Sequence, residues 1–151
     1  MKALDVAAHI INRCIDMGNP ISNLKLQKIL YFINMYYLVN RDRSLIDDNF
    51  FEAWQYGPVI EEVYNKYAIF VSNLIKVRDM RDDIEPFLTE DINMLYNFID
   101  KIANIPSWQL VDFSHTKDGA WDRVYKNGIG AYNIIPNAFI EDEARKIRDN
   151  R

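Results

Sequence analysis

The stretch from Leu24 to Val39 constrains the fold more than any other part of the sequence. Twelve of its sixteen positions are apolar or aromatic, and the four polar residues do not gather on one helical face. A helix that is apolar nearly all round is buried, and this run is shorter than the ~20 residues that a membrane span needs. We therefore predict that residues 22–40 form the central helix of the protein, with Ser22 as its N-cap.

The remaining sequence predicts further helices packed around this one. Apolar residues recur at helical spacing in several segments, which proline, glycine or charged turns separate. The segments are residues 2–17, 58–67, 89–105, 107–114 and 137–147, with one or two helical turns at 121–125. Neither a repeat nor a linker divides the chain, and 151 residues suit one domain. The sequence thus predicts a mainly α, single-domain bundle of five to seven helices over residues 1–151.

The aromatic stretch from Phe50 to Tyr56 favours an extended structure, and residues 74–77 are a candidate partner for it in a small two-stranded β element. The pattern changes at Gly57 and Pro58. Because proline is favoured at the first helical position, we expect Pro58 to begin a helix. We expect Gly57 to adopt a positive φ or to lie where another segment approaches closely. The expected buried stripe of this helix is Val59, Ile60, Val63, Tyr64 and Tyr67.

Charge and cysteine content narrow the class of protein. The net charge is −4 and the sequence pI is 5.2, whereas a nonspecific nucleic-acid binder needs dense Lys and Arg. Cys14 is the only cysteine, so the chain cannot form a disulfide within itself. No apolar leader follows the first residues. We expect a cytoplasmic protein that binds neither nucleic acid nor a membrane.

No motif in the sequence predicts catalysis. Two histidines, His9 and His115, and one cysteine do not make a cluster at zinc-ligand spacing. The sequence also lacks a G-x-S-x-G motif, a P-loop and a G-x-G-x-x-G motif. We expect no enzyme activity, no metal and no cofactor. One alternative stays open, an unrecognised enzyme in which His115 acts as a general base beside Asp112 or Asp118.

Several short motifs together indicate a known family. They are Leu26-Gln27-Lys28-Ile29-Leu30-Tyr31-Phe32, Phe51-Glu52-Ala53-Trp54-Gln55-Tyr56-Gly57-Pro58-Val59, then Tyr64, Ser114-His115 and Trp121. Over about residues 5–125 the chain resembles the Panacea (SocA-like) antitoxin domain, formerly known as phage-associated protein. Family members often have Pro-Trp where this chain has Ala120-Trp121, which puts the local turn there in question more than the fold.

The resemblance implies a mainly helical bacterial antitoxin that neutralises a cognate protein toxin by direct contact. It also implies that an adjacent gene encodes the toxin. One family member is an adaptor that delivers its toxin to an AAA+ protease, so proteolytic delivery is the second function that the resemblance implies. An acidic antitoxin would suit a basic toxin, because complementary charge speeds encounter.

The residues that carry the resemblance outside the apolar helices are also the expected binding surface. Trp, Tyr and His side chains are common interface anchors, and loops and helix starts keep binding groups accessible. The expected partner-binding residues are Trp54, Tyr56, Gly57, Pro58, Val59, Tyr64, His115 and Trp121. The alternative is a structural corner, in which Trp121 packs against the central helix and His115 bonds to a backbone carbonyl near Gly57.

Overall fold

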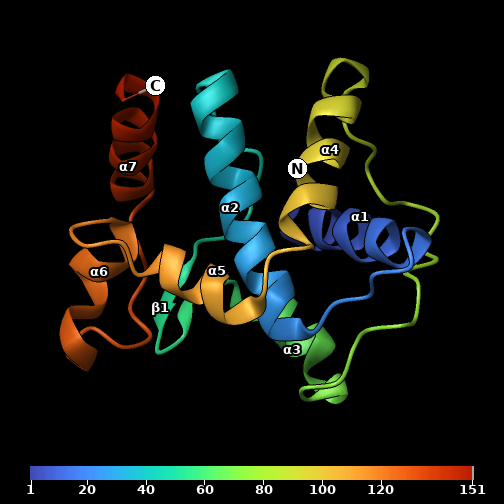
Figure 1. Ribbon diagram of the computed structural model, residues 1–151, viewed down its shortest axis with the longest axis horizontal. Coiled ribbons are helices and arrows are strands. Elements are labelled where there is room, and N and C mark those ends of the chain that lie inside the picture. The colour runs from blue at the N-terminus through green and yellow to red at the C-terminus, as the bar shows by residue number, and fades with distance from the viewer. Residues whose placement is uncertain (151) are drawn as a thin grey trace.

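The computed structural model describes residues 1–150 and has the mainly α fold that the sequence predicts (Figure 1). In these residues seven α-helices accompany one small antiparallel sheet. The helices are α1 (Ala3–Asp16), α2 (Asn23–Arg41), α3 (Glu61–Tyr67), α4 (Ile92–Ile102), α5 (Ser107–Ser114), α6 (Ala120–Tyr125) and α7 (Asn137–Asp149), and the strands are β1 (Glu52–Trp54) and β2 (Gly57–Val59). Short 3-10 turns occur at Ala68–Phe70, Thr89–Asp91 and Lys126–Gly128.

Helix α2 is the centre of the fold, as its apolar sequence predicts. Thirteen of its nineteen residues are buried. Figure 1 shows α2 between α7 on one side and α1 and α4 on the other, and it also packs against α5 and the β-hairpin. Ser22 caps its N-terminus by accepting a hydrogen bond from the Lys25 backbone N–H at 3.3 Å. The other elements are therefore built around one buried helix.

The contacts of the four polar residues within residues 24–39 of α2 explain why these residues do not share one helical face. The four polar residues reach three neighbouring segments and satisfy backbone groups there. The Asn34 side-chain oxygen accepts hydrogen bonds from the N–H groups of Leu45 and Ile46, at 2.9 and 3.0 Å. Gln27 accepts a hydrogen bond from the Ile60 N–H, and Lys28 donates one to the Pro58 carbonyl. Buried polar groups are tolerated only when they are hydrogen-bonded, so these side chains position the segments that surround the helix.

The β-hairpin confirms the two-stranded element but corrects its partner. Strand β1 pairs with β2 across the turn at Gln55 and Tyr56, with Ala53 opposite Pro58. The proposed pairing with residues 74–77 is wrong, because Ile75 donates its N–H to Ile21 O at 2.8 Å and that segment closes a different part of the fold. On its other edge β1 bonds to the segment before α7, where Ala53 N–H donates to Asn133 O at 2.8 Å.

The prediction that Pro58 begins a helix is also wrong. Pro58 lies in β2, and α3 begins at Glu61 with Ile60 as its N-cap residue. Two side chains of α2 hold the intervening residues extended. Gln27 accepts the Ile60 N–H at 3.0 Å and Lys28 donates to the Pro58 carbonyl at 2.6 Å. These tertiary bonds outweigh the local preference of proline for a helix start.

The remaining helices lie close to their predicted positions. Helices α1, α5 and α7 each match a predicted segment to within two residues, and a 3-10 turn precedes α4 where one continuous helix was expected. The buried stripe of α3 is narrower than predicted, because Val63 and Tyr67 are buried whereas Tyr64 is 36% exposed. Within residues 1–150, no helix has both the length and the apolar character needed to cross a membrane.

Candidate partner-binding site

Residues from the separate family motifs meet beneath the β-hairpin. Gly57 is buried with a φ of +111°, and a Cβ atom at that position would lie 2.5 Å from Ser114 Oγ and 2.9 Å from Lys28 Nζ. Both expected reasons for a glycine, a positive φ and a close approach, therefore hold at Gly57. The hairpin therefore packs directly on Lys28 of the central helix and on Ser114 at the end of α5.

Lys28 has an unusual environment for a charged side chain. It is fully buried, and its Nζ donates to the Pro58 carbonyl at 2.6 Å. No carboxylate in residues 1–150 forms an ion pair with it, and burial lowers the pKa of Lys28 to about 7. Lys28 therefore titrates near physiological pH, and in either protonation state its amino group donates the hydrogen bond that fastens the hairpin to α2.

His115 and Trp121 form a stacked pair beside this lysine. Their ring centroids are 3.7 Å apart and their planes differ by 4°. Trp121 is buried and donates its indole N–H to the Trp54 carbonyl at 2.8 Å, which ties α6 to β1. Burial and the nearby charge of Lys28 lower the pKa of His115, which favours its neutral form.

The imidazole of His115 makes neither of the side-chain bonds that the sequence suggested. Its Nε2 atom is buried and has no hydrogen-bond partner in the part of the chain that the structure describes, so the expected bond to a carbonyl near Gly57 is absent. Nor does a hydrogen bond or ion pair join the ring to the side chain of Asp112 or Asp118 in those residues. Its stack on Trp121 is the contact that defines its position.

A groove of about 670 Å³ lies on the exposed side of the hairpin. Its walls include Leu24, Trp54, Tyr56, Val59, Tyr64 and Tyr132. We refer to this feature as the hairpin groove. No charged residue lines it, and two of its tyrosines are largely exposed, Tyr56 at 60% and Tyr132 at 66%. The groove thus combines exposed aromatic rings with uncharged walls.

Trp54 lies at the centre of the aromatic wall. Its ring meets Tyr64 at a centroid distance of 4.8 Å and an angle of 61°, and Tyr132 at 5.4 Å and 68°. Its indole N–H donates to a Glu52 carboxylate oxygen at 2.9 Å. Its carbonyl accepts from Trp121 on the buried side, so one residue of β1 connects the groove with the residues beneath it.

The structure divides the eight expected binding residues into two groups. Trp54, Tyr56, Val59 and Tyr64 line the hairpin groove. The other four belong to strand β2 or to the segments packed beneath the hairpin. We refer to these four residues, together with Lys28 and Ser114, as the buried corner. They are Gly57, Pro58, His115 and Trp121; His115 is partly buried and the other three are buried. Tyr132 and Leu24 are groove residues that the sequence did not indicate, since Tyr132 follows an irregular glycine-containing turn and Leu24 belongs to the central helix.

Sequence comparisons identify the family of the chain. The family model described as "Antitoxin SocA-like, Panacea domain" matches residues 26–122, which include the hairpin, most of α2 and the first residues of α6. The chain belongs to this family. It is 34% identical over 139 residues to a protein named Antitoxin SocA from Caulobacter vibrioides (strain NA1000 / CB15N), an alignment that covers 86% of this chain and 73% of that protein. No solved structure matches the chain.

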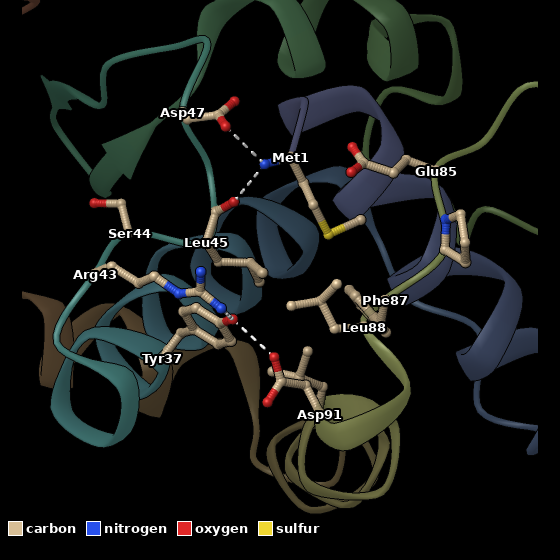
Figure 2. A pocket seen from close by; sticks show the side chains of 12 residues that line it. Met1, Tyr37, Arg43, Ser44, Leu45, Asp47, Glu85, Phe87, Leu88 and Asp91 are labelled. Atoms are coloured by element: carbon tan, nitrogen blue, oxygen red, sulfur yellow. Dashed lines mark hydrogen bonds and ion pairs between the residues drawn. The ribbon is translucent and has the colours of Figure 1, made fainter.

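A second pocket of about 330 Å³ lies away from the family motifs, between the loop after α2 and the segment before α4 (Figure 2). Its buried polar groups bond to one another. Tyr37 donates to Asp91 at 2.7 Å, Arg43 donates to the Tyr37 hydroxyl at 2.9 Å, and Arg41 pairs with Asp91 at 2.8 Å. A network that is satisfied in this way stabilises the two segments that it joins. Among residues 1–150, no three His, Cys, Asp or Glu side chains are grouped as metal ligands.

Proposed function

We propose that this member of the SocA-like antitoxin family binds and neutralises a protein toxin by direct contact, and that the hairpin groove is the docking surface. The observation that carries the proposal is the group of exposed aromatic side chains in a groove of interface-like composition. Tyrosine and tryptophan are the residues that most often anchor protein interfaces. The adjacent gene is the expected source of the toxin.

The proposal assigns the two groups of residues different tasks. The groove residues contact the toxin, while the buried corner holds the hairpin in place through Lys28, Gly57 and Trp121. It places no reaction at His115, whose Nε2 is buried and whose ring is stacked on Trp121. Neutralisation needs a stable complex and no chemical step, which agrees with this geometry.

The test is co-expression with the product of the adjacent gene. That product should stop growth when expressed alone and should be harmless when wild-type antitoxin is present. Tyr56→Ala should abolish rescue and weaken binding at least tenfold, roughly the effect of removing an interface anchor. Tyr56→Phe, which keeps the ring, is the matched control and should rescue. Failure of the adjacent product to inhibit growth, or full rescue by Tyr56→Ala, would contradict the proposal.

A second groove is the alternative docking surface, and the same co-expression experiment distinguishes it from the hairpin groove. It has a volume of about 350 Å³, is almost wholly apolar, and lies between α2, α4, α5 and α7, with Phe32, Phe98 and Phe113 among its walls. Phe113, on α5, is 47% exposed, so its truncation should not unfold the protein. We expect Phe113→Ala to rescue as well as wild type. Loss of rescue in Phe113→Ala but not in Tyr56→Ala would move the docking surface to this groove.

The same strains separate blocking from delivery to a protease. Under direct neutralisation the half-life of the toxin is unchanged or longer when the antitoxin is present, because binding stabilises a folded partner. A shortened half-life that depends on a cellular AAA+ protease would instead indicate proteolytic delivery.

A further inference from the structure

Three aromatic rings in the hairpin groove come from three separate segments. Trp54 belongs to β1, Tyr64 to α3 and Tyr132 to the segment before α7. Tyr64 and Tyr132 both meet Trp54 at steep angles, 61° and 68°. An edge-to-face contact covers at most one face of one ring, so Tyr64 and Tyr132 each keep a face that the contact with Trp54 does not cover, and all three rings line the same groove. We refer to these three rings as the aromatic cage.

Two carboxylates lie on the elements that carry the cage, although no charged residue lines the groove itself. Glu52 accepts the Trp54 indole N–H at 2.9 Å, and Glu61 lies three residues before Tyr64 on α3, which places both on one face of that helix. Neither carboxylate has an ion-pair partner in residues 1–150. The face of an aromatic ring is itself electronegative, and the Glu52 carboxylate adds a negative charge at the edge of the Trp54 ring.

From this geometry we infer that the aromatic cage receives the cationic side chain of a lysine or arginine on the partner toxin. The inference rests on the proposed function and adds the chemistry of the contact. Cations bind over the faces of Trp and Tyr rings, and two or three rings with a nearby carboxylate make a cage for one cation. The net charge of −4 favours encounter with a partner of opposite charge. The negative cage is therefore the point that fixes the register of the docked toxin.

The first experiment tests whether toxin binding depends on the aromatic faces of the rings or only on their apolar volume. Tyr64 and Tyr132 are each changed to Phe, which keeps the face, and to Leu, which keeps only the bulk. We expect each Leu variant to bind the purified toxin about tenfold more weakly, and each Phe variant to bind within about threefold of wild type. Trp108→Leu is the matched control, since Trp108 is 67% exposed on α5, outside the groove, and should have no effect.

The second experiment tests the cage without any toxin. The probe is acetyl-Gly-Arg-Gly-amide, compared with the same peptide carrying citrulline, the uncharged isostere of arginine. The indole ¹H–¹⁵N resonance of Trp54 is followed by NMR during the titration. We expect a saturable shift with the arginine peptide, lost in Tyr64→Leu, and at least about tenfold weaker binding of the citrulline peptide. An equal response to both peptides, or none to arginine, overturns the inference.

The two experiments can fail separately. If the Leu and Phe variants bind toxin equally well and wild type still neutralises it, the cage is wrong and the proposed function stands. If the adjacent gene product is neither toxic nor bound, the proposed function fails, and the peptide titration alone then decides whether the cage binds a cation.

Discussion

The hairpin groove and the buried corner share one hairpin but differ in what a substitution should change. In the groove, Tyr56 and Tyr132 expose most of their surface. In the corner, Gly57 and Lys28 are enclosed. Both regions contain family-motif residues, so membership in a motif does not by itself identify a binding residue. The difference teaches that one motif can serve two purposes. Trp54 and Tyr56 line the groove, whereas Gly57 and Pro58 form the strand that Lys28 contacts from below.

The largest expected effect is at Gly57. Gly57→Ala should lower the free energy of unfolding by about 3 kcal/mol or more, because it combines a positive φ with a clash against Ser114 and Lys28. Gly18→Ala is the matched control, since Gly18 has a φ of +69° but nothing within 4 Å of the added atom. It should lose only about 1 kcal/mol. Urea denaturation measures both, and equal losses would show that no close approach exists at Gly57.

The second prediction concerns the pH dependence that Lys28 creates. Folding lowers the pKa of Lys28 to about 7, whereas in the unfolded chain it keeps its proton to about pH 10.4. Between these values the unfolded state binds more protons, so stability rises with pH. Wild type should gain about 1.5 kcal/mol from pH 7 to pH 8.5 relative to Lys28→Met.

Urea denaturation at both pH values measures this difference, and groups common to both proteins cancel in it. Lys76→Met is the control, because Lys76 is exposed and should give the same pH dependence as wild type. A wild-type profile parallel to that of Lys28→Met would mean that Lys28 keeps its charge throughout.

A smaller effect is expected at His115. His115→Ala removes the ring stacked on Trp121 and should cost about 1 kcal/mol, a fall in melting temperature of about 2–4 °C. His115→Phe keeps a ring there without the unpartnered nitrogen, so it should be at least as stable as wild type. Both variants should still rescue cells at a permissive temperature. A stable His115→Ala protein that no longer binds toxin would instead place His115 in the docking surface.

The smallest effect on stability is expected in the groove. Tyr56→Ala should change the free energy of unfolding by less than about 0.5 kcal/mol, as is usual for an exposed side chain. Its loss of toxin binding would then be separate from stability, in contrast to the substitutions in the corner. Thermal unfolding of purified Tyr56→Ala checks this, and a fall of several degrees would erase the distinction between the two regions.

The central helix could be predicted because its signal is local. Residues 24–39 are apolar on every side, and no tertiary contact is needed to conclude that such a helix is buried. The start of α3 could not be predicted in this way. Pro58 favours a helix locally, and the bonds from Gln27 and Lys28 that keep it extended come from residues about thirty positions earlier. Sequence patterns carry no information on contacts of that separation.

Only part of the candidate site could be predicted, because the rest depends on contacts between distant segments. Aromatic residues near Gly57 were evident from the sequence, and four of the expected residues do line one groove. Which of the eight face outward depends on the pairing of β1 with β2 and with the segment around Asn133. Tyr132 reaches Trp54 only through this pairing. Tyr132 reaches the site through the pairing of its segment with β1, and such a residue lies in no periodic sequence pattern that would predict its position.

The attachment of the hairpin from below has a consequence for how such a protein can change over evolutionary time. Lys28 and Gln27 hold the strand backbone at Pro58 and Ile60, so the turn keeps its shape whatever side chains project from its outer face. Substitutions at Tyr56 or Tyr132 can then accumulate with little loss of stability. If the proposed function holds, a lineage carrying this scaffold can alter its choice of toxin through a few surface positions while the fold stays the same.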